Sequence, residues 1–229
     1  TEHRALSLRE VAQLTGYNKS AAQRFCHTLV KLGYLRRHPN NSDFELSVRT
    51  TEIGARFVQS NSLLRRAQPY LHQLCNKTCG AVTLSILEGA EVVFAARYLG
   101  ADVLETNVTV GSRLPIYCTA SGRAAASLLD DAALGRVLDA QDFAPRTAKT
   151  VVDRADIEAL IHKCRTLGFA LVSDQFAMTD LSLAVPLYDR ETQTYAAITL
   201  ALTTASHSEG EVVERFAALM QSTARAIAN

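Results

Sequence analysis

Side chains that can hydrogen-bond to the edges of DNA bases recur at helical spacing near the start of the chain. Arg24 carries a guanidinium that matches the two acceptors of guanine, and the amide of Gln23 matches adenine. Lys31, Arg36 and Arg37 carry cations suited to phosphate. The pattern predicts a nucleic-acid-binding face whose groove-facing residues are Lys19, Ser20, Ala21, Gln23, Arg24 and His27.

The segment from Gly111 to Arg123 has the composition of a loop that runs into a helix. The unpaired N–H groups and the dipole of a helix start favour a small carboxylate, and Thr119 and Ser121 add hydroxyl donors. The same residues also suit a helix that caps itself and packs tightly on a sheet. Chemistry alone favours the second interpretation and leaves the first open.

Cys118 precedes this helix start, a position that lowers the pKa of a thiol and can activate it. A nucleophile also needs a base, and no histidine lies within 40 residues of Cys118 along the chain; the nearest are His72 and His162. We therefore expect Cys118 to be a packed residue of a pocket wall, and the chain not to be an enzyme.

His72, Cys75 and Cys79 follow each other at helical spacing, which raises the possibility of a zinc site. A fourth ligand is not evident, so ordinary packing is the expected role, with no metal and no cofactor. The five cysteines are an odd number without a repeat, which is typical of reduced thiols in the cytosol.

Charge is distributed unevenly along the 229 residues, although the net charge is only +1. Residues 1–66 hold eleven Lys and Arg against five Asp and Glu, whereas the remaining residues carry an excess of acid. This indicates a polyanion-binding head on an ordinary body, although a solvated basic face would look the same. No apolar stretch reaches the length of a membrane span and no leader is recognisable, so we expect a cytoplasmic protein without a membrane partner.

The head has the order of a winged helix-turn-helix, which we assign to residues 1–50. Two short helices flank the turn at Thr15-Gly16-Tyr17, and a hairpin follows Gly33. One apolar stripe consists of Leu8, Val11, Ala12 and Leu14, and a second, expected to face inward, of Ala22, Phe25, Cys26, Leu29 and Leu32. A helix normally precedes this pair, so we expect the sequence to begin inside the domain.

The rest of the chain predicts a linker helix over 51–66 and an effector-binding domain over 67–229. The linker is expected to break near Asn61-Ser62, with a second helix starting around Pro69. Its apolar residues Ile53, Phe57, Leu63 and Leu64 are expected to join protomers. Strands are predicted at 82–87, 91–98, 104–110, 169–172, 183–188 and 195–202, mixed with helices, which favours an α+β body with a mainly antiparallel sheet.

Nearly the whole chain resembles the IclR family of transcriptional regulators. The resemblance rests on the order and spacing of short motifs: Leu8-Arg-Glu-Val-Ala12, Gly16, Lys19-Ser20, Leu29 to Tyr34, Gly54, Gly111-Ser-Arg-Leu-Pro115, Thr119-Ala-Ser-Gly122-Arg123, Leu167-Gly168-Phe169-Ala170, Ala184-Val-Pro186 and Ala196-Ala-Ile198. The Pro-x-Tyr-Cys-Thr form resembles members that control the catabolism of aromatic compounds.

The resemblance implies a winged helix domain, a linker helix, and an effector domain with a curved sheet flanked by helices. It also implies dimers or pairs of dimers on DNA, and a small organic acid as effector. By family position the pocket residues would be Cys118, Thr119, Ala120, Ser121, Asp174, Ser182, Thr199 and Ala201. Thr179-Asp180-Leu181 departs from the family, because many relatives have a basic residue there, so hydroxyls and backbone donors are left to hold an anion.

Together these features predict a ligand-responsive regulator that binds double-stranded DNA. Its effector is expected to bias two dimer arrangements through the helices at 51–77. The alternatives are a small-molecule sensor whose head does not read DNA and, less favoured, a cysteine-dependent enzyme.

Overall fold

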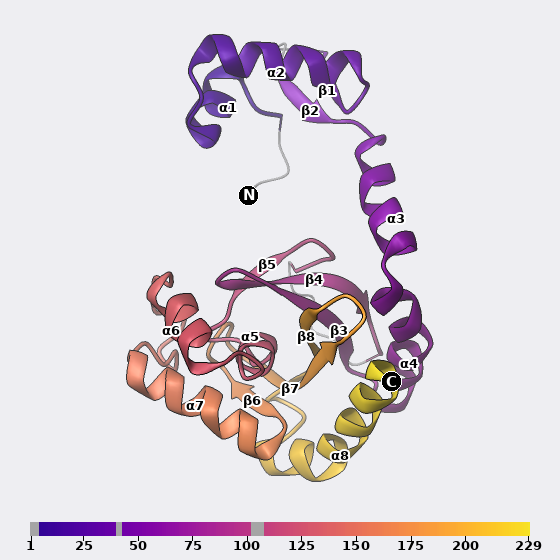
Figure 1. Ribbon diagram of the computed structural model, residues 1–229, viewed down its shortest axis with the longest axis vertical. Coiled ribbons are helices and arrows are strands. Elements are labelled where there is room, and N and C mark those ends of the chain that lie inside the picture. Colours follow the sequence, from indigo (N-terminus) through magenta and orange to yellow (C-terminus); the bar gives the residue numbers. More distant parts are fainter. Residues whose placement is uncertain (1–4, 40–42, 102–107) are drawn as a thin grey trace. The chain divides into compact units, whose positions relative to one another are not determined.

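The computed structural model describes residues 5–39, 43–101 and 108–229, and the chain divides into two units. The first unit is Thr1–Asn61 and the second is Ser62–Asn229, so the boundary falls inside the expected 51–66 linker. Figure 1 traces the elements of both units in chain order. None of the helices formed by the described residues combines the length and apolar character that a membrane crossing requires.

The first unit contains the predicted helix-turn-helix. Helices α1 (Leu8–Thr15) and α2 (Lys19–Lys31) are joined by a turn in which Gly16 adopts φ 71°, a left-handed conformation that favours glycine. The Ser7 side chain accepts from Glu10 N at 3.3 Å while Glu10 accepts from Ser7 N at 2.8 Å, which is a capping box. Asn18 caps α2 by accepting from Ala21 N at 2.9 Å.

The predicted wing is also present. Strands β1 (Leu35–Arg37) and β2 (Phe44–Leu46) pair antiparallel, and Leu6 extends this pairing through a bridge to Phe44. Helix α3 (Thr50–Ser60) follows and ends the unit. The turn residues 40–42 lie outside the described part of the chain, as does any helix before residue 5.

The prediction of which apolar residues of α2 face inward is only partly correct. Ala22 and Cys26 are buried, but Phe25, Leu29 and Leu32 are 56%, 39% and 50% exposed, and Leu14 of α1 is exposed as well. Phe25 stacks on Tyr17 with ring centroids 5.2 Å apart, which covers part of its surface. The described residues of the first unit therefore cover only the Ala22 and Cys26 side of this apolar sector.

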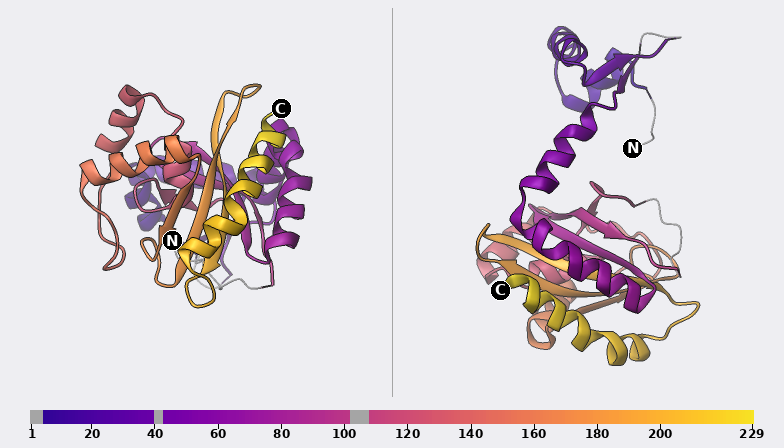
Figure 2. Two further views of the ribbon diagram at one scale, coloured as in Figure 1. Left: turned by 90° about the horizontal axis from the view of Figure 1, so that it is seen from below. Right: turned by 90° about the vertical axis from the view of Figure 1, so that its right-hand side faces the viewer.

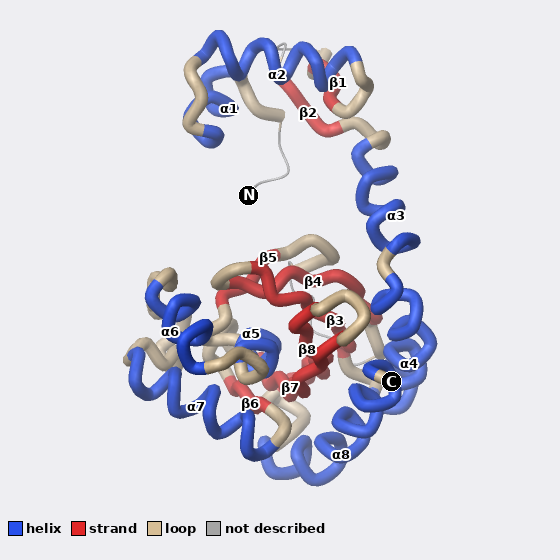
Figure 3. Tube along the Cα trace, viewed as in Figure 1, coloured by secondary structure: helices blue, strands red, loops and turns tan. Residues whose placement is uncertain are grey.

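The second unit is built on a six-stranded antiparallel sheet that curves strongly (Figure 3). Its order is β5-β4-β3-β8-β7-β6. The strands are β3 (Ala81–Glu88), β4 (Glu91–Tyr98), β5 (Arg113–Pro115), β6 (Ala170–Ser173), β7 (Asp180–Asp189) and β8 (Thr194–Thr203). The strand predicted at 104–110 is not found where the structure is described: residues 108–110 form loop and turn, and 104–107 lie outside the described residues.

Helices cover both faces of this sheet (Figures 1 and 2). Helices α4 (Ser62–Thr78) and α8 (Glu209–Ala228) pack on one face, where alternate residues of β7 such as Leu181, Leu183 and Val185 are buried. Helices α5 (Ala120–Ala126), α6 (Asp131–Asp139) and α7 (Arg154–Leu167) lie on the other side. The predicted α+β body, with a curved antiparallel sheet flanked by helices, is confirmed.

Helix α4 begins earlier than expected, at Ser62 instead of near Pro69. Proline inside a helix removes one backbone hydrogen bond and costs about 3 kcal/mol. Burial of Leu63 and Leu64, which are 0% and 4% exposed, contributes about 1.5–3 kcal/mol each and outweighs that cost. These two leucines therefore belong to the core of the second unit, which corrects the expectation that they join protomers.

Arg66 fastens α4 to the rest of the second unit. Its guanidinium contacts Asp189 and Glu191 at 2.5 Å each and donates to the carbonyl of Ile227 at 3.4 Å. The side chain of Asp189 is only 1% exposed. Burial opposes ionisation of Asp189, but hydrogen bonds from Thr192 and the charge of Arg66 hold the pKa of its carboxyl below the usual range.

We expect Arg66→Ala to lower the free energy of unfolding at pH 7 by about 1–3 kcal/mol, because a buried carboxylate loses its cation. A lowered folded pKa stabilises the fold above the ordinary aspartate pKa of about 4, and this contribution is lost as the pH falls through the folded value. Urea unfolding of wild type and variant at pH 7 and in acid measures both effects. Arg65→Ala, at the exposed neighbouring position, is the control; an equal loss in both variants would contradict the assignment.

Candidate functional site

The polar residues of α2 form one continuous face. Lys19, Ser20, Gln23, Arg24 and His27 are all exposed, and Lys31 is exposed in the last turn. Ala21 is half-buried. At 100° per residue these positions lie opposite the apolar sector of the helix, so they are open to a groove. The structure brings together the residues that the sequence proposed as a DNA-reading face.

The two wing arginines are exposed, but each has an intramolecular contact. Arg36 forms an ion pair with Glu45 at 2.8 Å, and the guanidinium of Arg37 lies 4.8 Å from the centroid of the Phe44 ring. Glu45 neutralises part of the charge of Arg36 where it would approach a phosphate.

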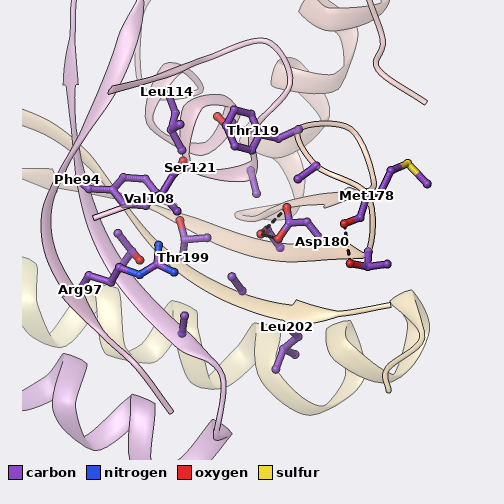
Figure 4. Close-up of a pocket in the computed structure, with 18 residues that line it drawn as sticks. Phe94, Arg97, Val108, Leu114, Thr119, Ser121, Met178, Asp180, Thr199 and Leu202 are labelled. Carbon is purple, nitrogen blue, oxygen red and sulfur yellow. Dashed lines mark hydrogen bonds between the residues drawn. The ribbon is translucent and has the colours of Figure 1, made fainter. Parts of the chain in front are cut away.

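A cavity of about 440 Å³ lies between the curved sheet and the start of α5 (Figure 4). The residues expected at a pocket that do line it are Thr119, Ala120, Ser121, Ser182, Thr199 and Ala201. Large apolar side chains form much of the remaining wall: Phe94, Val108, Leu114 and Phe176. This combination of an apolar wall and a few polar groups is typical of a small-molecule site.

Strand pairing explains why these hydroxyl residues meet. Thr199 of β8 is opposite Thr83 of β3, and Ala201 is opposite both Ala81 and Ser182. Residues that are directly opposite in adjacent strands share a face of the sheet. Because side chains alternate, the leucines between them point to the α4–α8 face.

A β-bulge in β4 adds a cation to the cavity. Leu84 pairs with Ala96 but Ser85 pairs with Phe94, so Ala95 is an extra residue. The bulge reverses the alternation, and Phe94 and Arg97 therefore reach the same cavity (Figure 4). The Arg97 guanidinium lies 5.9 Å from the centroid of the Phe94 ring. We expected only hydroxyl groups and backbone donors to be available for an anion in the pocket. The presence of Arg97 in the cavity wall corrects that expectation.

An acid lies in the same cavity. Asp180 is the first residue of β7, and the Ser182 hydroxyl donates to its carboxylate oxygens at 2.9 and 3.1 Å. Burial is the main cause that raises the pKa of Asp180 to about 6, and the charge of Asp174 acts in the same direction, while the Ser182 hydrogen bond and the charge of Arg97 oppose the rise. Burial also lowers the pKa of Arg97. The cavity thus contains an acidic and a basic group with perturbed ionisation.

The start of α5 caps itself. The Thr119 side chain accepts from Gly122 N at 3.1 Å and donates to the carbonyl of Pro115 at 2.6 Å, so its hydroxyl is already engaged. A Cβ on Gly122 would lie 2.3 Å from Cα of Ile116, so glycine is what allows the helix to approach this loop. Thr119 therefore acts as the cap of its own helix, as the second interpretation of this segment predicted. Ser121, the next hydroxyl residue of this segment, is 3% exposed and lines the cavity.

Two expected pocket residues, Cys118 and Asp174, do not line the cavity. Cys118 is fully buried in a separate cluster with Ile116 and Tyr117. Burial raises the pKa of its thiol, although Arg146, the Tyr117 hydrogen bond and Arg123 oppose the shift, so the thiolate that a nucleophile needs is disfavoured. Cys118 is thus packed in an apolar cluster that is separate from the cavity.

Asp174 braces the loop that carries part of the cavity wall. It accepts from Thr179 N at 2.6 Å and from Lys149 Nζ at 2.7 Å, and its own N–H donates to the Asp180 carbonyl at 2.7 Å. Arg123, buried in α5, donates to the Tyr117 carbonyl at 2.8 Å and to Gln175 Oε1 at 2.6 Å. Burial lowers the pKa of Arg123 to about 10, so it remains charged. Asp174 and Arg123 are positioning residues.

Sequence reasoning missed Phe94, Arg97 and Asp180 as cavity residues. The bulge that turns Arg97 inward left no signal in the alternation of β4, which read as an ordinary hairpin strand. Asp180 was noticed as a departure from the family, but β7 was expected to begin after it.

Of the three residues that raised the possibility of a zinc site, only Cys75 is buried; His72 is exposed, and Cys79 is exposed and follows the end of α4. His72 makes an edge-on contact with Tyr98 at 6.1 Å between ring centroids, and Cys75 Sγ donates to the Gly80 carbonyl at 3.6 Å. Within the described ranges, no three His, Cys, Asp or Glu side chains gather closely enough to hold a metal ion.

Comparison with known proteins agrees with this architecture. The chain matches the family model of the IclR helix-turn-helix domain over residues 1–39 and that of the bacterial transcriptional regulator IclR C-terminal region over residues 55–229. The Pca regulon regulatory protein of Pseudomonas putida is 29% identical over 97% of this chain and 76% of its own length. The XynR regulator of Escherichia coli is 27% identical over 90% of this chain and 82% of its own.

Solved structures share the fold. A transcriptional regulator of Rhodococcus sp. RHA1 is 30% identical, covers 100% of this chain and 91% of its own, and superposes with a TM-score of 0.83. An IclR homolog of Microbacterium hydrocarbonoxydans, solved with 4-hydroxybenzoate, is 20% identical and has a TM-score of 0.78, with 97% of this chain and 90% of its own covered. Since the C-terminal family model alone matches well over half of the residues, the chain belongs to the IclR family of bacterial transcriptional regulators.

Proposed function

We propose that this regulator binds double-stranded DNA through α2 and the wing, and that a small organic acid in the cavity of the second unit modulates this binding. The observation that carries the proposal is a cavity containing Arg97 in a chain that also exposes a base-reading face on α2. Such a regulator acts in the cytoplasm, where its operator lies.

The proposed effector is an aromatic carboxylate. Arg97 supplies a cation for the carboxylate, and the buried Thr199 Oγ1, which has no hydrogen-bond partner in the described part of the chain, supplies a donor. A buried hydroxyl without a partner costs about 1–3 kcal/mol, which a ligand would offset. Phe94 and Phe176 offer flat apolar surfaces for a ring. The 4-hydroxybenzoate held by the Microbacterium relative has this chemistry.

The proposed assembly is a homodimer or a pair of dimers. Ile53 and Phe57 of α3 are 58% and 49% exposed, and Val58 beside them is also exposed. Exposed apolar side chains on one helix are typical of a surface that joins protomers. The effector would then act by shifting the balance between two dimer arrangements through α3 and α4, which Asn61 connects.

We expect Arg24→Ala to weaken operator binding by about 1–3 kcal/mol and to relax base choice at one position of each half-site, because a bidentate contact to guanine is lost. Gel shifts of the full-length protein on its own upstream region measure this. Lys31→Ala is the comparison and should weaken all sequences alike, with a smaller salt dependence. A wild type that shifts no DNA would instead favour the sensor without DNA readout.

We expect the wild type to form at least a dimer at micromolar concentration, and Ile53→Glu with Phe57→Glu to shift it towards the 24.9 kDa monomer, since charges would be placed in an apolar contact. Light scattering after size-exclusion chromatography measures the mass. Gln59→Glu, also on α3 and exposed, should leave it unchanged. A monomeric wild type would refute α3 as a protomer contact.

We expect Ser121→Leu to abolish effector binding while leaving the DNA affinity of the ligand-free protein intact. The larger side chain would fill space beside the cavity wall at α5, whereas the base-reading face belongs to a separate unit. Calorimetric titration with 4-hydroxybenzoate and operator gel shifts measure the two properties. Ser121→Ala keeps the cavity open and should retain most of the affinity; unchanged binding by Ser121→Leu would place the ligand elsewhere.

A further inference from the structure

We propose that Asp180 determines which acids the cavity accepts, by accepting a hydrogen bond from a hydroxyl or amino group of the effector. The effector would thus carry two polar ends, a carboxylate for Arg97 and a hydrogen-bond donor for Asp180. This inference rests on the proposed function, because it assigns a second contact to the same cavity.

The two charged groups reach the cavity from different strands. Arg97 comes from β4 and Asp180 from β7, and β3 and β8 lie between them in the sheet. Figure 4 shows the Arg97 guanidinium beside Thr199, with Asp180 farther along the cavity next to the loop that carries Met178. A ligand that touches both groups must therefore carry its polar groups apart, with the apolar wall around its middle.

Hydrogen-bond direction decides what Asp180 can recognise. Ser182 has one hydroxyl proton, and it is donated to Asp180. Both side chains can then only accept from a ligand, and an ionised carboxylate has room for further donors. At the other end, Arg97 has only donors. The cavity therefore favours one orientation of the ligand, with the acceptor group at Arg97 and the donor group at Asp180.

An acid without a donor fits this site poorly. It would leave the Asp180 carboxylate in a largely apolar cavity with Ser182 as its donor. A site built to hydrogen-bond a ligand hydroxyl discriminates strongly against the analogue that lacks it. We expect a preference of about 10- to 100-fold.

The test is calorimetric titration of the full-length protein with benzoate, 3-hydroxybenzoate, 4-hydroxybenzoate and 4-methoxybenzoate at pH 7.5. At least one hydroxybenzoate should bind about 10-fold or more tightly than benzoate. The methoxy compound, which has no proton to donate, should not recover this gain. Asp180→Asn, which removes the charge but keeps the shape, should reduce the preference several-fold and improve benzoate binding. Asp142→Asn, at an exposed position, is the matched control.

The pH dependence separates a contact with the ligand from a structural role. Among the residues that the structure describes, the charged groups that act on Asp180 are Arg97 from β4 and Asp174 from the loop after β6, the latter paired with Lys149. Since the pKa of Asp180 is about 6, the hydroxyl preference of the wild type should be full at pH 7.5 and shrink at pH 5, where the carboxyl is protonated. The preference of Asp180→Asn should not change with pH. The wild-type profile decides the matter even if the variant does not fold.

Each outcome has one meaning. A preference that neither pH nor Asp180→Asn alters, or equal affinity for benzoate and both hydroxybenzoates, overturns the role of Asp180. Failure of all four acids to bind overturns it as well, while operator gel shifts show whether the proposed DNA-binding function still stands. Loss of the operator shift itself would count against the proposed function and not against Asp180.

Discussion

The antiparallel pairing of β3, β8 and β7 is the constraint on which the second unit depends. Pairing sends every second side chain to the same face, so the leucines of β7 and β8 pack on α4 and α8 while Ser182, Thr199 and Ala201 face the cavity. A shift of one residue would exchange the two sets and expose the core. The polar site and the apolar core are thus consequences of one register.

A β-bulge in β4 interrupts this alternation and adds a charged group to the cavity. The extra residue Ala95 places Arg97 on the cavity side, where Phe94 lies beneath its guanidinium. Asp180, the first residue of β7, adds an acidic side chain to the same cavity. Arg123 and Asp174, both buried, hold the neighbouring segments in place but do not line the cavity, so the site depends on residues that no ligand would touch.

Much of the fold could be predicted from local signals. The capping residues Ser7, Asn18 and Asp153 mark helix starts that the structure contains, because a cap acts within one turn of its own helix. The end of the linker helix near Asn61 was also predicted. The beginning of α4 was not, because burial of Leu63 and Leu64 against distant segments outweighs the local effect of Pro69. The prediction that Phe25 faces inward was wrong for the same reason, since burial depends on which residues lie nearby in space.

The sequence by itself determined the family, the winged helix-turn-helix, the exposed polar face of α2 and most of the hydroxyl residues around the cavity. These follow from periodicity and motifs, which are properties of short segments. Only the tertiary structure decided that Arg97 and Asp180 share one cavity and that Cys118 and Asp174 stay outside it. A bulge and the pairing of strands far apart in the chain set those positions, and neither leaves a trace in local spacing.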